Sequence, residues 1–218
     1  RAEIDTVIEV QRTVAKREGC AFFDLFAAMG GKGSLARFKD KGFLSDDLVH
    51  PTWRGGDVLG QLFADALLQS YLDTPAAEGG MAVARRREAK VPKPRFAGLS
   101  FPSEEQAVVV VNGATRDEPQ ARRPLARFFD HLRALERGEV ARVAVGQLGA
   151  SHTAGQMWTD RMRERLTDRF GSAGRGFISV GRESKRLAMT GVVRTLEGNF
   201  EIADGREVML GGTVGMSG

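Results

Sequence analysis

Two short motifs in this chain carry residues that could perform acid–base and nucleophilic chemistry. Asp47 and His50 lie three residues apart in the run Asp-Asp-Leu-Val-His at 46–50. A carboxylate at that spacing can orient an imidazole and stabilise its protonated form, as a histidine general base requires. Ser151 stands in Gly-Ala-Ser-His-Thr at 149–153, where a predicted strand gives way to a helix. A serine at such a junction is a candidate nucleophile, so the three residues could form a Ser-His-Asp catalytic triad.

Each motif taken alone also has a purely structural interpretation. Serine is a preferred N-cap residue, so Ser151 could simply cap the helix that begins there. Asp47 and His50 could form a polar turn that caps the helix following them. A metal site built from these two residues and Cys20 is disfavoured, because the spacing is odd and a fourth ligand is missing. We therefore predict no metal ion and no cofactor.

The composition is typical of a folded globular protein. Of 218 residues, 42% are hydrophobic and 28% are charged. A basic tract at 85–95 contributes to the net charge of +4; it could bind an acidic polymer, but a solvated linker is favoured, so we expect no nucleic-acid partner. The single cysteine, Cys20, excludes an intrachain disulfide, and its aromatic surroundings predict a buried thiol. No apolar run reaches the roughly 20 residues that span a membrane.

Hydrophobic spacing predicts helices around both motifs. Apolar residues that recur every three or four positions predict helices over 2–17, 34–40, 54–71, 118–137 and 157–170. Strands are predicted for 21–26, 108–111 and 142–147, which are rich in β-branched or aromatic residues.

Two regions of the chain lack the helical spacing of apolar residues. Between 73 and 104, prolines, glycines and basic residues show no sustained periodicity, which predicts a linker. From 179 to 218, glycine-rich turns separate short β-prone runs, which predicts small antiparallel strands.

Together with their flanking residues, the two motifs resemble the SGNH (GDSL-type) hydrolases. Residues 139–178, with Gly-Ala-Ser-His-Thr-Ala-Gly, resemble the opening of that fold, where a Gly-Asp-Ser motif carries the nucleophile. Residues 1–72, with Asp-Leu-Val-His-Pro-Thr, resemble its closing part, where an Asp-x-x-His-Pro motif supplies the base and its orienting acid. One departure is Ala150, which stands where the family has an acidic residue that could order the loop.

The resemblance implies an α/β fold with partial SGNH-type, doubly wound (flavodoxin-like) elements, followed by the start of a β-rich insertion at the C-terminus. The family places its nucleophile first and its Asp-x-x-His motif last, so the reversed order here implies two tandem, incomplete domains. The implied parts are the end of a first domain (1–72), a linker (73–104), the start of a second domain (105–178) and a carbohydrate-binding-like insertion (179–218). On this interpretation the serine and the Asp-His pair belong to different sites and do not meet.

The resemblance also implies an activity, that of a serine esterase or deacylase outside the cytoplasm. The substrate would be O-acylated, such as an acetylated cell-wall glycan. Ser151 would attack the ester carbonyl while its own N–H donates to the oxyanion, and His50, oriented by Asp47, would be the proton-transfer base of the other domain. The alternative is a non-catalytic pair of degenerate domains that bind glycan or serve a structural role, which Ala150 favours. A weaker hypothesis is that the 85–95 tract binds anionic polymers. The oligomeric state is not predicted.

Overall fold

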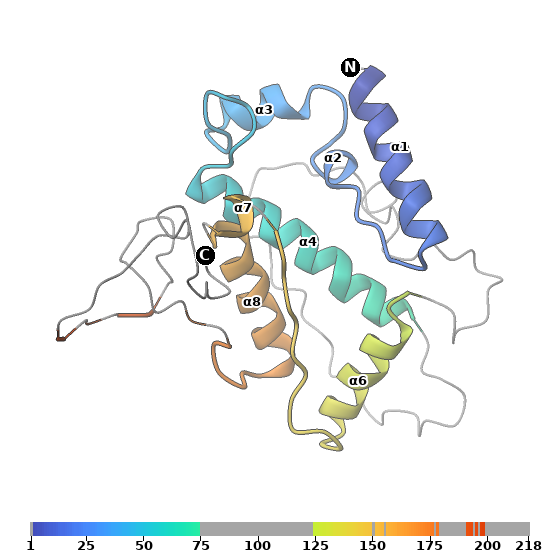
Figure 1. Cartoon of the computed structure of the whole chain (residues 1–218), viewed down its shortest axis with the longest axis vertical. Helices are drawn as coiled ribbons and strands as arrows, with labels where there is room; N and C mark the ends of the chain where they lie inside the picture. The colour runs from blue at the N-terminus through green and yellow to red at the C-terminus, as the bar shows by residue number, and fades with distance from the viewer. Residues whose placement is uncertain are drawn as a thin grey trace, which may run out of the picture.

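Helices dominate the part of the chain that the structure describes. The computed structural model describes residues 2–74, 124–149, 151–154 and 156–176, together with 178, 191–193, 195, 197 and 198. The helices there are α1 (Ala2–Arg17), α2 (Leu25–Ala28), α3 (Ser34–Asp40), α4 (Trp53–Asp73), α6 (Ala126–Glu136), α7 (Ser151–Ala154) and α8 (Met157–Phe170). Figure 1 shows α4 crossing the middle of the molecule, with α8 beside it and α6 near its C-terminal end. None of the described helices is both long and apolar enough to cross a bilayer.

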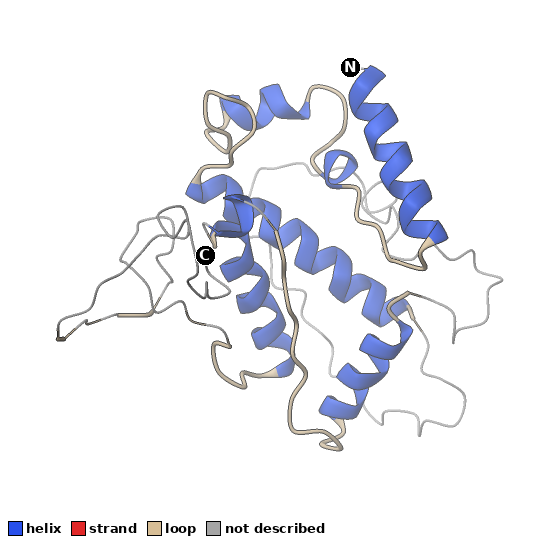
Figure 2. Cartoon of the chain, viewed as in Figure 1, coloured by secondary structure: helices blue, strands red, loops and turns tan. Residues whose placement is uncertain are grey.

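The α/β fold expected from the sequence, with its partial SGNH-type doubly wound elements, is wrong: the described residues form no sheet (Figure 2). The only β-bridge among them joins Leu44 and Pro51 in antiparallel orientation. A sheet requires extended segments side by side, so that N–H and C=O groups can pair. The loops at 20–24 and 142–148 pair neither with each other nor with another described segment.

The aromatic run at 21–26 is not the strand that its composition predicts. Its first residues form an extended loop, and α2 begins at Leu25 because Asp24 caps that helix by accepting the N–H of Ala27 at 2.8 Å. The prediction that Cys20 is buried is also wrong, since its thiol is exposed. Cys20 follows α1 and is exposed, and the half-buried residues after it form a loop, not part of a sheet.

The strand predicted at 142–147 is a loop, and no described segment pairs with it. Local β-propensity favours extended backbone, but pairing depends on residues far away in the chain. The predicted strand at 108–111 and nearly all of 179–218 lie outside the described residues, as does the basic tract. The domain boundaries at 72 and 105 therefore stay predictions.

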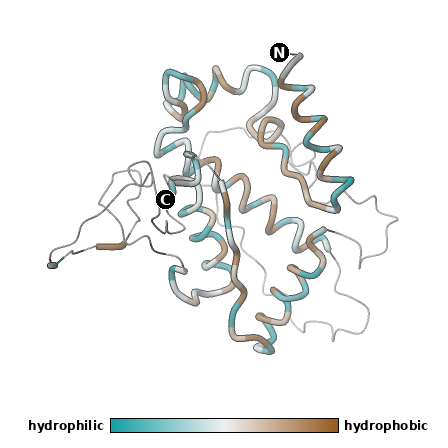
Figure 3. The backbone as a smooth tube through the Cα atoms, viewed as in Figure 1, coloured by the Kyte–Doolittle hydropathy of each residue, from teal (hydrophilic) through white to brown (hydrophobic). Residues whose placement is uncertain are grey.

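The predicted helices agree closely with the structure. Those expected over 2–17, 34–40 and 157–170 are α1, α3 and α8, and α4 is slightly longer than expected. The helix expected over 118–137 is α6, although the beginning of that range lies outside the described residues. Apolar residues recur along α1 in Figure 3, but several of them are exposed: Ile4, Val7, Val10 and Val14.

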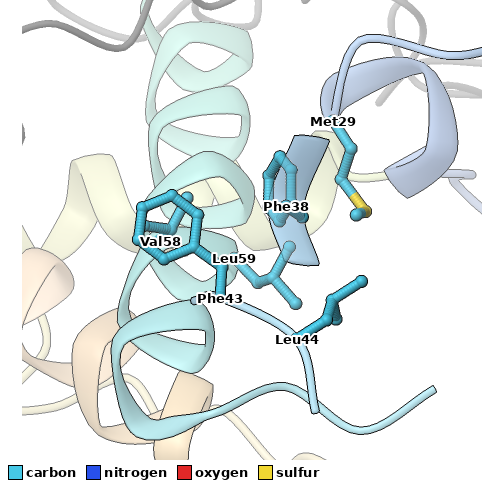
Figure 4. Close-up of a cluster of buried hydrophobic side chains, with 6 residues drawn as sticks. All are labelled: Met29, Phe38, Phe43, Leu44, Val58 and Leu59. Atoms are coloured by element: carbon cyan, nitrogen blue, oxygen red, sulfur yellow. The ribbon is translucent and has the colours of Figure 1, made fainter. Parts of the chain in front are cut away.

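Buried side chains form two clusters along α4. The first joins α3 and the following loop to the beginning of α4 (Figure 4), and its members are Met29, Phe38, Phe43, Leu44, Val58 and Leu59. The second joins the end of α4 to α6, and its members are Leu67, Tyr71, Phe129 and Leu132. Helix α8 contributes to both, with Trp158 against the first and Phe170 against the second. Segments on either side of the predicted linker therefore share their cores.

Helices α4 and α8 approach closely because Gly60 has no side chain. A Cβ at Gly60 would lie 2.3 Å from the carbonyl oxygen of Trp158. An ion pair reinforces the contact, since Arg165 Nε donates to Asp65 Oδ1 at 2.9 Å. The Arg165 side chain is only 2% exposed, and a buried cation without a partner would destabilise the fold by about 3–5 kcal/mol. The α4–α8 contact is therefore specific in its geometry, which matters for the site described next.

Candidate functional site

The loop from Phe43 to Thr52 holds the Asp-His motif in a closed turn. At its base, the Thr52 N–H donates to the Phe43 carbonyl at 3.0 Å. Nearer its tip, the carbonyl of His50 accepts both the N–H of Ser45 at 2.8 Å and the Ser45 hydroxyl at 2.6 Å. Since backbone and side chain both close the turn, Asp47 and its neighbours have little freedom to move apart.

The turn contains a residue with a strained backbone, and hydrogen bonds to the Asp47 side chain offset the cost of that strain. Leu48 has a φ of 57°, in the left-handed region that costs a residue with a side chain about 1–2 kcal/mol. Asp47 Oδ1 accepts the backbone N–H groups of Val49 and His50, each at 2.9 Å. Backbone strain held in place by such bonds is typical of functional loops.

The second oxygen of the same carboxylate orients the imidazole. Asp47 Oδ2 lies 2.7 Å from His50 Nδ1. The His50 backbone N–H, the imidazole and then the Val49 N–H hold the pKa of the Asp47 carboxyl well below its usual range. An ionised carboxylate can only accept, so Nδ1 carries the hydrogen. Nε2 is therefore the ring nitrogen left free to take a proton.

Ser151 faces that nitrogen. It is the first residue of α7, and its Oγ lies 3.3 Å from His50 Nε2. The expectation that the serine and the Asp-His pair do not meet is therefore wrong, because the structure brings all three into contact within one chain. The distance is slightly longer than the roughly 3.2 Å at which a base can take a proton. The expectation failed because motif order does not reveal that α8, directly after α7, packs against α4, directly after the loop.

The residues that precede Ser151 are hydrogen-bonded to α7. Gln147 Nε2 donates to Thr153 Oγ1 at 3.3 Å. A Cβ at Gly149 would lie 2.2 Å from the same Thr153 oxygen, so the glycine leaves room for that side chain. Ala150, the departure from the family motif, lies outside the described residues.

His152 also contacts the loop, although the sequence assigns it no role. Its Nε2 lies 2.9 Å from the carbonyl oxygen of Val49. Its ring stacks on that of His50, with centroids 5.2 Å apart and planes inclined by 25°. The one sequence signal for it was its position next to the candidate nucleophile. The remaining histidine, His131, is exposed on α6, as its place in the sequence predicts.

The assembled site is open to solvent. The Asp47 and His50 side chains are each 50% exposed, and Ser151 is exposed. Exposed apolar residues lie close by in the sequence, among them Val49 and Trp53. A small ester could therefore reach the serine without any rearrangement of the described residues.

Thr52 links the loop to α4, and its loss is expected to destabilise both. As the N-cap of α4, its Oγ1 accepts the N–H of Gly55 at 3.1 Å and donates to the carbonyl of Gly42 at 2.7 Å. Thr52→Ala is expected to lower the free energy of unfolding by about 1–2 kcal/mol, measured by urea denaturation. Thr52→Ser keeps the hydroxyl and should lose less than half as much. Equal losses in both variants would show that the hydroxyl is not what stabilises this junction.

Comparison with known proteins identifies no relative for this chain. No family model, no curated protein and no solved structure matches it. The resemblance to the SGNH hydrolases therefore rests on the two motifs and their flanking residues alone.

Proposed function

We propose that the chain is a serine-dependent ester hydrolase with Ser151 as its nucleophile. One observation carries this proposal: the contacts from Asp47 to His50 at 2.7 Å and from His50 to Ser151 at 3.3 Å. A hydroxyl next to a base that a third group orients is the arrangement of an activated nucleophile. A serine that only capped a helix would not need an oriented imidazole opposite its hydroxyl.

The geometry supports a two-step reaction. Ser151 Oγ attacks the acyl carbon while its proton passes to His50 Nε2, giving a tetrahedral intermediate and an imidazolium that Asp47 stabilises. The intermediate collapses as the ester C–O bond breaks, and the leaving alkoxide takes the proton from Nε2. Water then attacks the acyl-serine, again giving its proton to Nε2, and the carboxylic acid departs as Oγ recovers its hydrogen.

The oxyanion would be stabilised by the backbone N–H of Ser151. As the first residue of α7, Ser151 has an N–H that no residue of the same helix accepts. Each donor to an oxyanion typically contributes about 10²–10³ in rate. With this one donor assigned, the site suits activated esters, and natural substrates with poor leaving groups should react more slowly.

The resemblance of the motifs extends the proposal to a substrate class. It favours an O-acylated carbohydrate as the natural ester, at a location outside the cytoplasm. The alternative, a non-catalytic module that binds glycan, has less support, because it gives no reason for the contacts among Asp47, His50 and Ser151.

Covalent labelling tests the proposal directly. Wild-type protein should hydrolyse p-nitrophenyl acetate and react with a fluorophosphonate, since Oγ displaces fluoride from phosphorus and His50 takes the proton. Mass spectrometry should place the adduct on Ser151. Ser151→Ala should abolish both reactions, whereas Ser172→Ala, at another exposed serine, should leave both unchanged. An unlabelled wild type, or a Ser151→Ala variant that keeps its turnover, would refute the assignment.

A further inference from the structure

Two neighbouring side chains of α7 contact the loop that carries the base. Ser151 Oγ meets His50 Nε2 at 3.3 Å, and His152 Nε2 meets the Val49 carbonyl at 2.9 Å. The first contact is the one along which the proposed reaction moves a proton. The second joins the same two segments without touching the reacting atoms.

The His152 contact fixes which ring nitrogen bears hydrogen. A backbone carbonyl can only accept, so Nε2 of His152 must donate to Val49. His50 has the opposite arrangement, because its Nδ1 donates to Asp47 and its Nε2 faces the serine hydroxyl. Two histidines whose rings stack at 5.2 Å therefore have different tautomers and different tasks.

The hydrogen bond from His152 orients the peptide group between Val49 and His50. The carbonyl of Val49 and the N–H of His50 belong to one planar peptide unit. His152 holds its oxygen end at 2.9 Å, and Asp47 Oδ1 holds its hydrogen end, also at 2.9 Å. Rotation of this peptide would break both hydrogen bonds, so they fix its orientation.

We propose that His152 is a positioning residue, which orients the Val49–His50 peptide and the His50 ring so that Nε2 faces Ser151. The inference rests on the proposed function, because positioning matters for catalysis only if Ser151 reacts. No step of the proposed reaction uses His152, which contacts the loop backbone and the face of the His50 ring. Its donor fixes the peptide, and its stacked face limits rotation of the neighbouring imidazole.

Three substitutions of His152 distinguish the effect of its hydrogen bond to Val49 from the effect of its stacked ring. His152→Gln keeps an N–H near the Val49 carbonyl, His152→Phe keeps a stacked ring, and His152→Ala keeps neither. Because the hydrogen bond fixes the peptide, we expect Phe and Ala to lower kcat on p-nitrophenyl acetate about tenfold, with KM within about twofold. Gln should stay within about threefold of wild type. His131→Gln, at an exposed histidine of α6, is the matched control and should change neither constant.

Either of two kinetic outcomes would overturn the proposal. One is a wild-type kcat in all three variants. The other is a kcat close to wild type in His152→Phe together with a reduced kcat in His152→Gln. Thermal unfolding midpoints within a few degrees of wild type would establish that any loss of kcat does not come from unfolding.

An NMR experiment separates this proposal from the proposed function. Imidazole nitrogen–proton correlation spectra should show hydrogen on Nε2 of His152 and on Nδ1 of His50. The His50 ring signals should shift in His152→Ala and return toward wild type in His152→Gln. This measurement needs no turnover, so a wild type with these signals but without esterase activity would refute the function and keep the positioning role. Hydrogen on Nδ1 of His152, or unchanged His50 signals in His152→Ala, would refute the positioning role.

Discussion

Asp47→Asn is expected to lower kcat/KM for p-nitrophenyl acetate by about 10²–10⁴-fold. The asparagine oxygen can still accept the N–H groups of Val49 and His50, so the turn should survive. Its amide nitrogen, however, would donate toward His50 Nδ1, where the carboxylate now accepts. The imidazole would then carry its hydrogen on Nε2, facing Ser151, and could not take the serine proton. Steady-state kinetics at neutral pH measure the effect.

Asp46 provides the matched control for this substitution. It precedes Asp47, its side chain is fully exposed, and its contact is an exposed ion pair with Lys39 at 3.5 Å. Exposed pairs of this kind contribute about 0–1 kcal/mol to stability. Asp46→Asn should therefore keep wild-type kinetics. Equal activity in the Asp46 and Asp47 variants would remove the carboxylate from the mechanism.

The same carboxylate gives the loop a defined response to acid. Its folded pKa is lowered, so its contribution to stability is fully present above the unfolded pKa of about 3.9 and is lost as the pH falls through the lower folded value. The Asp47→Asn variant lacks this contribution. The difference between its thermal unfolding midpoint and that of wild type should therefore stay constant from pH 7 to about 4 and narrow only as the pH is lowered further.

Gly60→Ala is expected to lower the free energy of unfolding by about 3 kcal/mol. The new Cβ would lie 2.3 Å from the backbone oxygen of Trp158, which cannot rotate away as a flexible side chain could. The resulting overpacking exceeds the roughly 1 kcal/mol that alanine gains over glycine inside a helix. As α8 moves off α4, it carries α7 with it, so Ser151 should retreat from His50. Urea denaturation and the rate of fluorophosphonate labelling should therefore both change.

Gly146→Ala is the control for this prediction. A Cβ at Gly146 would meet no atom within 4 Å, and its backbone needs no positive φ. Its stability and labelling rate should match wild type. If Gly60→Ala were as stable as this control, α4 and α8 could not approach as closely as the structure shows.

The helices could be predicted from the sequence because their determinants are local. In α8, Trp158, Met162, Leu166 and Phe170 recur at four-residue spacing, and Gly171, with a φ of 85°, ends the helix where expected. The stretch at 142–147, predicted as a strand, is a loop in the structure. Its lack of a partner could not be foreseen, because strand pairing depends on distant segments.

The same distinction explains the candidate site. The Asp47–His50 contact spans three residues and is set by one turn, so spacing alone predicted it. The Ser151–His50 contact spans 101 positions and depends on how α8 lies against α4, which no local pattern reveals. His152 was missed for the same reason, since its acceptor is a carbonyl 103 positions earlier.

The chain has two tryptophans, and they occupy contrasting environments. Trp53 begins α4 three residues after His50 and is 57% exposed, whereas Trp158 is partly buried and meets the ring of Phe63 edge-on at 5.6 Å. Indole emission shifts to longer wavelength when the ring moves from an apolar environment into water. The red shift on unfolding therefore comes from Trp158 and follows separation of α4 and α8. Trp53 is already exposed to water in the folded chain, so its emission should change little on unfolding. The emission of Trp158 therefore reports on whether the α4–α8 contact is intact.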